Sequence, residues 1–208
     1  METQHFNRVF SERRVKKYFD QHHQNQTLAI EHYLLNMELS ECFYSILSIY
    51  EVCLRNKIDR ELSRHCYQHF QTSAWYDIFC SEQSYRRLGR KIQKAMRVLR
   101  EEGKVVNSDN LIPELPLGFW TTLFNDNYER TLWQPLRRVF SNVPRRQRQR
   151  RSIKNELNRI RKFRNRIFHY EPISWHSNVL ETYHRQILAA IKKMDVEVFY
   201  LAHEVENF

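Results

Sequence analysis

Residues 152–173 read SIKNELNRIRKFRNRIFHYEPI, and this stretch indicates how the chain folds. Its apolar residues recur three or four positions apart, the spacing of one buried helix face: Ile153, Leu157, Ile160, Phe163 and Ile167. Pro172 limits how far such a helix can extend, because the residue before a proline avoids helical backbone angles. The stretch therefore predicts an amphipathic helix from Ser152 to Phe168.

Helical spacing of apolar residues continues through most of the 208-residue chain. Thr27 is the expected N-cap of a long helix, and Gly103 is placed to end a later one. With 3 Gly and 5 Pro in the whole chain, few sites for tight turns exist. We therefore expect an all-α protein, with helices at 6–19, 27–69, 84–100, 152–168 and 177–198 and further helical turns between 119 and 140.

One segment interrupts this pattern. Residues 104–118 concentrate turn-forming residues, among them Asn107, Pro113 and Gly118. We interpret 104–118 as an internal loop and not a domain boundary, because a chain of this length usually forms one domain. Residues 1–208 are thus expected to form a single domain.

Other features narrow the class of protein. No stretch of eighteen apolar residues occurs, and residues 1–10 contain no apolar core of signal length, so we expect a cytoplasmic protein that does not enter a membrane. The four cysteines have no zinc-binding spacing and are expected to be reduced. We predict no metal site and no cofactor.

The charge of the chain favours a polyanionic partner. The sequence has 34 Lys and Arg against 24 Asp and Glu, a formal net charge of +10. Between Arg137 and Arg166 almost every charged residue is basic, and Glu156 is the one acid. A solvated surface explains many such runs, but like charges repel each other unless a partner relieves them. Candidate RNA-binding residues in this tract are Arg145, Arg146, Arg148, Arg150, Arg151, Arg161, Lys162 and Arg166.

The candidate active site lies where this basic tract ends, at Arg164, Asn165 and His169. Arg164 and His169 are five positions apart, but this spacing alone is weak evidence. Three Arg and His pairs with that spacing occur in the chain, where its composition predicts roughly one. The other two are Arg60 with His65 and Arg64 with His69. In a straight helix Arg164 and His169 would point about 140° apart, so their convergence requires the helix end to turn or a second chain to contribute.

Arg164 falls inside the apolar face of its helix, where a guanidinium needs a partner. Glu51 interrupts the apolar face of the 27–69 helix in the same way, and we predict that the two residues face each other. The pair is either structural or holds Arg164 in place for a phosphate. Arg55 and Asn56 lie one turn further along the same helix. A solvated helix surface explains them at least as well as a place at the edge of the active site.

The run from Phe163 to Ile173, FRNRIFHYEPI, resembles the C-terminal motif of the Abi family (AbiD/AbiF-like) of abortive-infection proteins, which belongs to the HEPN superfamily. Residues 50–58 resemble the N-terminal helix of that family, and Gly118, Phe119, Trp120 and Trp133 resemble its middle; the resemblance covers roughly residues 28–205. It implies a HEPN-like helical bundle with additional helices. It also implies an RNA-cutting enzyme whose active site forms across a homodimer, in phage defence or in a toxin-antitoxin system with an antitoxin RNA or protein.

The chemistry that the resemblance implies suits these side chains. The 2′-hydroxyl of RNA can attack the neighbouring phosphate, so no metal-activated water is required, and the products would be a 2′,3′-cyclic phosphate and a 5′-hydroxyl. A histidine with an ordinary pKa of about 6.5 can move protons at neutral pH, which suits His169. Arg164 would hold the phosphate, and Asn165 would orient the histidine or the scissile group.

Three other interpretations stay open at this point. In the first, His169 simply caps a helix end while Arg164 pairs with Glu51 or Glu171 for structural reasons. In the second, the chain is a non-catalytic RNA-binding regulator that uses the basic 137–166 face. In the third, it is a basic helical protein that assembles with acidic proteins and not with RNA.

Overall fold

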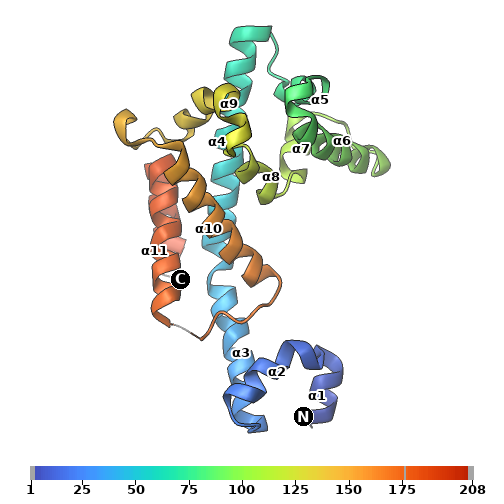
Figure 1. Cartoon of the computed structure of the whole chain (residues 1–208), viewed down its shortest axis with the longest axis vertical. Coiled ribbons are helices and arrows are strands. Elements are labelled where there is room, and N and C mark those ends of the chain that lie inside the picture. Colours follow the sequence, from blue (N-terminus) through green and yellow to red (C-terminus); the bar gives the residue numbers. More distant parts are fainter. Residues whose placement is uncertain (1–2, 176, 206–208) are drawn as a thin grey trace.

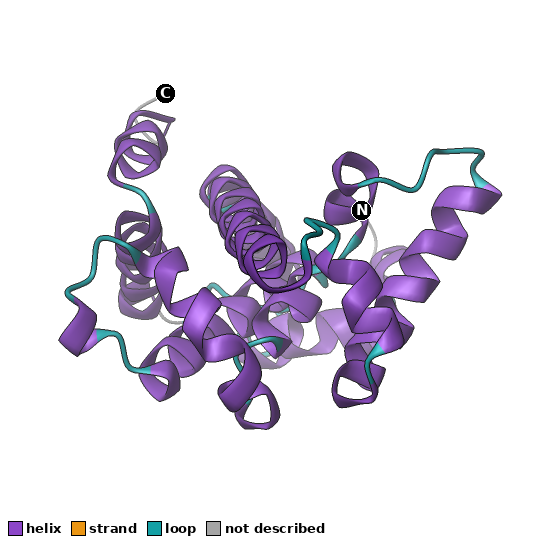
Figure 2. Ribbon diagram, turned by 90° about the horizontal axis from the view of Figure 1, so that it is seen from above, coloured by secondary structure: helices purple, strands orange, loops and turns teal. Residues whose placement is uncertain are grey.

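In the computed structural model, residues 3–175 and 177–205 are described, and all their regular structure is helical (Figures 1 and 2). The all-α prediction is thus confirmed. None of these helices combines the length and apolar composition needed to cross a membrane. The α-helices are α1 (Thr3–Phe10), α2 (Glu12–Gln21), α3 (Gln26–Cys42), α4 (Tyr44–Phe70), α5 (Trp75–Ser81), α6 (Arg86–Glu101), α7 (Ser108–Glu114), α8 (Leu117–Thr122), α9 (Glu129–Leu136), α10 (Arg150–Phe168), α11 (Ser177–Met194) and α12 (Val196–Val205).

The long helix α4 is the centre of the fold (Figure 1). It contacts α3, α5, α7, α8, α9, α11 and α12, while α10 packs on α8 and α11. The predicted 152–168 helix is α10, and all five of its apolar positions are buried. The Phe163 ring stacks on Tyr183 of α11 at 4.0 Å and meets Phe43 edge-on at 4.9 Å. These contacts fix the rotation of α10 and therefore the direction of Arg164.

A smaller hydrophobic cluster joins α1, α2 and α3 at the N-terminal end of the molecule. It contains Phe6, Val15, Tyr18, Phe19, Ala29 and Tyr33, with Trp175 packed against it. The predicted single helix at 6–19 is wrong: Ser11, at φ 63°, separates α1 from α2. The bend lets the Phe6 ring fold back to 5.5 Å from Tyr33, a contact that one straight helix would not make.

The predicted 27–69 helix is also two helices, α3 and α4, separated by Phe43. Phe43 keeps backbone angles near those of a helix, at φ −88° and ψ −13°, and its side chain is 7% exposed and packs on Phe163. Asn25 takes the place of Thr27 as N-cap, because its Oδ1 accepts the Leu28 amide at 3.2 Å. The predicted 177–198 helix is also interrupted, at Asp195, whose Oδ1 accepts the amides of Glu197 and Val198 in the first turn of α12.

The predicted 104–118 loop contains a helix, α7, and the start of α8. Asn107 caps α7 by accepting the Asn110 amide at 3.0 Å, so part of the turn-forming composition marks helix starts. Gly103 does end α6, as predicted. It has φ 70°, and the next amide, of Lys104, donates to Leu99 O at 2.8 Å.

Gly89 permits the close packing of α6 on α5. A Cβ atom there would lie 2.5 Å from the backbone oxygen of Phe79. Alanine normally stabilises a helix relative to glycine by about 1 kcal/mol, but we expect Gly89→Ala to lower the free energy of unfolding by about 1–3 kcal/mol through overpacking. Chemical denaturation measures this. Gly118→Ala is the control, because its Cβ would meet only the Arg161 side chain at 3.7 Å; equal effects of the two changes would contradict the prediction.

Candidate functional site

Arg164 is held on two sides within the bundle. Its Nη2 lies 3.3 Å from Glu51 Oε2 on α4, which confirms the predicted pair. Its guanidinium carbon lies 3.9 Å from the centre of the Phe168 ring, one turn later on α10. The Arg164 side chain is 26% exposed, so it reaches the surface from a fixed position. A cation held in this way is oriented before any ligand arrives.

His169 is exposed and ends α10. The chain leaves the helix through Tyr170 at φ 54°, and the Glu171 amide donates to Arg166 O at 2.8 Å. This hydrogen-bond pattern is the helix stop that Gly103 makes after α6, with tyrosine at the position where glycine is usual. A non-glycine residue in this backbone region costs about 1–2 kcal/mol, so the surrounding contacts hold the turn in place.

Arg164 and His169 have different neighbours. Arg164 contacts Glu51 and Phe168, whereas His169 opens toward α2. Within the described residues no hydrogen bond or ion pair joins the two side chains, because α10 keeps its helical form up to Phe168. Asn165 contacts His169 through the backbone: the carbonyl oxygen of Asn165 accepts the amide of His169 at 2.9 Å. The helix end therefore does not turn His169 toward Arg164 on the same chain.

A hollow of about 470 Å³ lies beside His169. We call it the His169 hollow, and it is lined by Ser11, Arg13, Arg14, Lys17, His169, Tyr170, Glu171 and Pro172. Three cations thus reach it from α2, and the Arg14 guanidinium lies 5.8 Å from the Tyr170 ring centre. This arrangement brings residues more than 150 positions apart in sequence to one place.

Asn36 of α3 holds the segment that follows His169. It is 2% exposed, and its Oδ1 accepts the amides of Ile173 at 2.7 Å and Ser174 at 3.2 Å. Its Nδ2 donates to Glu171 O at 3.5 Å. One buried side chain therefore fixes the backbone of residues 171–174.

A second contact with this segment runs through His32. Its Nε2 lies 2.8 Å from Ser174 Oγ and its Nδ1 lies 2.9 Å from His22 Nε2. Burial, and then the neighbouring His22, lower the pKa of His32 from its ordinary value. The neutral form of His32 is therefore favoured, and it suits a network in which each ring nitrogen has a partner.

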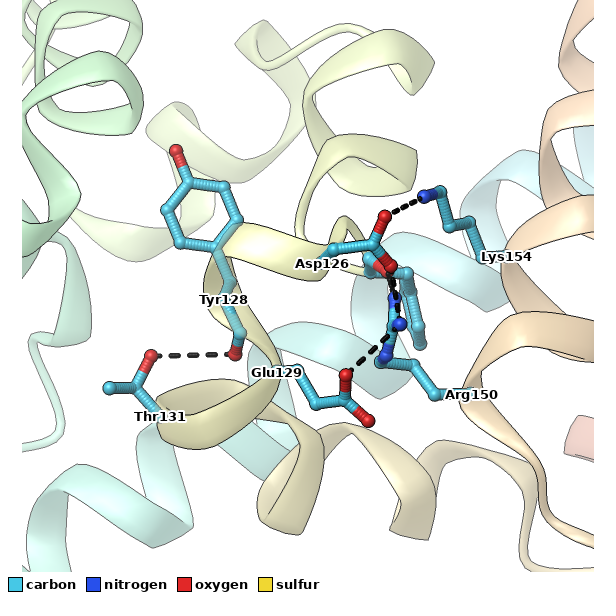
Figure 3. A network of polar contacts seen from close by, with 7 residues as sticks. Asp126, Tyr128, Glu129, Thr131, Arg150 and Lys154 are labelled. Atoms are coloured by element: carbon cyan, nitrogen blue, oxygen red, sulfur yellow. Dashed lines mark hydrogen bonds and ion pairs between the residues drawn. The ribbon is translucent and has the colours of Figure 1, made fainter.

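The structure gives two of the candidate RNA-binding arginines internal roles. Arg148 donates to backbone oxygens of Val143, Ser141 and Arg137. Arg150 donates to Phe124 O at 2.8 Å, is hydrogen-bonded to Asp126 and lies 3.1 Å from Glu129 Oε2, as Figure 3 shows for the two acids. Arg148 thus holds the turn at 137–143, and Arg150 holds residues 124–129 against α10. Both guanidinium groups are engaged within the chain, which distinguishes them from the exposed candidates.

The other candidates in the basic tract differ in their surroundings. Arg166 is bound to the 171–172 segment, where it donates to Pro172 O and lies 3.6 Å from Glu171. Arg161 is half-buried and donates to Asn158. Four candidates are exposed on the surface: Arg145, Arg146, Arg151 and Lys162.

Arg55 and Asn56 line a hollow other than the His169 hollow. Theirs lies between α4 and α7 and also includes Asp59, Ser108 and Ile112. Glu51, one turn earlier on α4, points to Arg164 instead. Of the three residues suggested for the edge of the site, only Glu51 contacts it.

The basic residues of α2 were missed by sequence reasoning. Arg13 and Lys17 stand four positions apart, which places them on one helix face, and this was the only signal in the sequence. A hollow of about 630 Å³ beside α10 brings the predicted Arg161 and Lys162 together with Asn155, Asn158 and Arg159, which were not among the candidates. The α10 residues are sequence neighbours of the predicted site, whereas nothing adjacent in sequence links the α2 residues to His169.

Comparison with family models, with curated proteins and with solved structures finds no match to this chain. Among the described residues, no three His, Cys, Asp or Glu side chains gather in a way that could hold a metal ion. The helical fold, the residues around His169 and the sequence motif are therefore the observations from which a function can be inferred.

Proposed function

We propose that this chain is a metal-independent endoribonuclease of the HEPN type. The observation that carries the proposal is the exposed imidazole of His169 in a hollow lined by Arg13, Arg14 and Lys17. Cations in this arrangement attract a phosphate backbone, and imidazole is the side chain best suited to move protons at neutral pH. Arg164, held by Glu51, supplies a positioned guanidinium on the same helix.

The proposed reaction uses the 2′-hydroxyl of RNA as the nucleophile. The 2′-oxygen attacks the adjacent phosphorus, and the bond from phosphorus to the 5′-oxygen breaks. One proton leaves the 2′-hydroxyl and one reaches the departing 5′-oxygen, so the products carry a 2′,3′-cyclic phosphate and a 5′-hydroxyl. His169 exchanges a proton with one of these oxygens, and Arg164 stabilises the charge that develops on the phosphate.

We further propose that a homodimer completes the site. Arg164 and His169 of one chain have different neighbours, and one chain provides a single motif for two proton transfers. Two copies related by a twofold axis would bring two such motifs together. The second copy then supplies the other proton-transfer group.

The biological role is proposed from the resemblance of residues 163–173 to Abi-family abortive-infection proteins. Such an enzyme would act in phage defence or as the toxin of a toxin-antitoxin pair, with an antitoxin RNA or protein as partner. The strongly basic composition, with its net charge of +10, supports RNA as the substrate.

RNA cleavage by the full-length chain, with and without EDTA, tests the proposal. We expect EDTA to leave the rate unchanged, the 5′ ends of the products to be unphosphorylated, and His169→Ala to remove the activity. Absence of cleavage on a varied set of RNAs, or equal cleavage by His169→Ala, would count against an enzyme.

The second candidate is a non-catalytic RNA-binding regulator. The exposed Arg145, Arg146, Arg151 and Lys162 on and before α10 favour it, because they could bind RNA phosphates without His169. Tight, salt-dependent RNA binding without cleavage would select this alternative over the nuclease.

Glu51 gives a test of the positioned arginine. Glu51→Gln keeps the size of the side chain but removes the charge that orients Arg164. Because both side chains are mostly buried, we expect the free energy of unfolding to fall by about 1–3 kcal/mol, and cleavage is therefore measured where circular dichroism shows that the variant is folded. The single-turnover cleavage rate should fall by up to about 10²-fold, because the guanidinium is no longer held in one place. The control is Glu181→Gln, an exposed acid paired with Arg185 on α11; equal losses of rate in both variants would oppose a role for Glu51.

A further inference from the structure

The walls of the His169 hollow carry a concentrated positive charge. Arg13, Arg14 and Lys17 line it from α2, and the one acid in its lining, Glu171, lies 3.6 Å from the Arg166 guanidinium. The hollow is open to solvent and, at about 470 Å³, has ample room for a phosphate with its sugar. Its charge and size suit a nucleotide unit and not an apolar ligand.

Helix α3 holds both walls of this hollow. Buried residues of α2, Val15, Tyr18 and Phe19, pack in one cluster with Ala29 and Tyr33 of α3. The opposite wall, residues 169–172, continues into the segment whose amides are accepted by Asn36 of the same helix. The two walls are therefore fixed relative to each other, and little order has to be created when a ligand binds.

Trp175 strengthens this connection. Its ring lies 5.0 Å from the ring of Tyr18 on α2 and 4.5 Å from the ring of His32 on α3. The end of the segment thus packs on both α2, which lines the other wall, and α3, which supports it. The hollow is lined by two parts of the chain, 11–17 and 169–172, and Trp175 connects both of them to α3.

We propose that the His169 hollow is a phosphate-binding subsite that holds the RNA backbone next to the bond that is cut, with Arg13, Arg14 and Lys17 as its ligands. The inference rests on RNA as the ligand of the function proposed above. It makes the N-terminal helices part of the substrate site, so RNA binding does not depend on the basic tract before α10 alone. These three residues bind and position the strand and take no part in proton transfer.

The test compares RNA binding by the wild-type chain with binding by the variant Arg13→Gln, Arg14→Gln and Lys17→Gln. The probe is a single-stranded RNA with 2′-deoxy substitutions, which cannot be cleaved by 2′-hydroxyl attack. Removal of each phosphate-binding cation should lower the slope of log affinity against log salt by roughly 0.7, so we expect a total reduction of about 2. Affinity at about 0.1 M salt should fall on the order of 10- to 100-fold.

The matched control removes three charges from the exposed face of α6, far from α2 in Figure 1: Arg90→Gln, Lys94→Gln and Arg97→Gln. We expect this control to bind RNA with nearly the wild-type slope. Equal losses in both variants would mean that net charge alone acts, and would overturn the subsite. All six residues are exposed, and unchanged circular dichroism would confirm that both variants fold.

A cleavable RNA separates this inference from the proposed function. In the variant of α2, the KM for cleavage should rise while the rate at saturating RNA stays near that of the wild type. If the wild-type chain cleaves RNA and the α2 variant binds and cleaves it equally well, the subsite is wrong and the nuclease stands. If no cleavage occurs but the α2 variant alone loses binding, the subsite stands and the nuclease is wrong. Competition by free inorganic phosphate as strong as by RNA would indicate a small-anion site instead.

Discussion

His169→Ala is expected to lower the rate of RNA cleavage by about 10²- to 10⁴-fold, the range that a positioned proton-transfer group contributes. Binding of uncleavable RNA should change little, because Arg13, Arg14 and Lys17 remain in the lining of the hollow. The His169 side chain is exposed, so the free energy of unfolding should stay close to that of the wild type. Single-turnover cleavage and fluorescence anisotropy measure the two quantities separately.

The matched control is His69→Ala. His69 is exposed near the end of α4 and follows Arg64 by the same five positions that separate His169 from Arg164. If the surroundings of the motif and not its spacing create activity, His69→Ala should cleave RNA as the wild type does. Comparable losses in both variants, or none in either, would contradict the assignment of His169.

Asn36→Leu is expected to destabilise the protein by about 2–5 kcal/mol, because the amides of Ile173 and Ser174 lose their acceptor inside the protein and each unsatisfied group costs about 1–3 kcal/mol. Leucine has the same branched shape with slightly larger terminal groups, so the change removes hydrogen bonds and leaves no cavity. Hydrogen exchange should become faster at these two amides, and chemical denaturation gives the change in stability.

Ser40→Ala provides the comparison for Asn36→Leu. Ser40 is equally buried, at 2% exposed, and its hydroxyl donates only to Asn36 O within α3, at 2.7 Å. Its loss should cost about 1 kcal/mol and leave exchange at Ile173 and Ser174 unchanged. Protection of those amides in Asn36→Leu at the wild-type level would show that another group holds the segment.

The two variants together address how the site is built. His169→Ala tests the chemistry at the end of α10. Asn36→Leu tests how the following segment is supported, because Asn36 is 2% exposed and lies on α3, near the opposite end of the sequence. If α3 fixes both walls of the His169 hollow, Asn36→Leu should also weaken RNA binding, although Asn36 does not line the hollow.

Periodic features could be predicted from the sequence. The five apolar positions of α10 are all buried, because a 3.6-residue repeat can face one side only. The pairing of Arg164 with Glu51 followed from the same reasoning, since a charge on an apolar face needs an opposite charge. Gly103 ends α6 as expected, because glycine tolerates the backbone angles that a helix stop requires.

Helix breaks and the uses of individual arginines could not be predicted in this way. Phe43 has no helix-breaking chemistry, yet α3 ends beside it, at a residue whose ring packs on Phe163. Arg145, Arg148 and Arg150 belong to the same basic run and look alike in the sequence. They differ in that the fold places carbonyl or carboxylate groups beside Arg148 and Arg150. A run of like charges gives no information about which members are satisfied internally.

Short-range periodicity and the cost of a buried charge were enough to predict that the protein is helical, which face of α10 is buried, and that Arg164 needs an acid beside it. Only the packing of distant helices places Arg13, Arg14 and Lys17 of α2 beside His169 and lets Asn36 hold the segment that follows His169. These contacts join residues more than 130 positions apart, and they form because folding buries apolar surface of α1, α2 and α3 together, which no local pattern encodes.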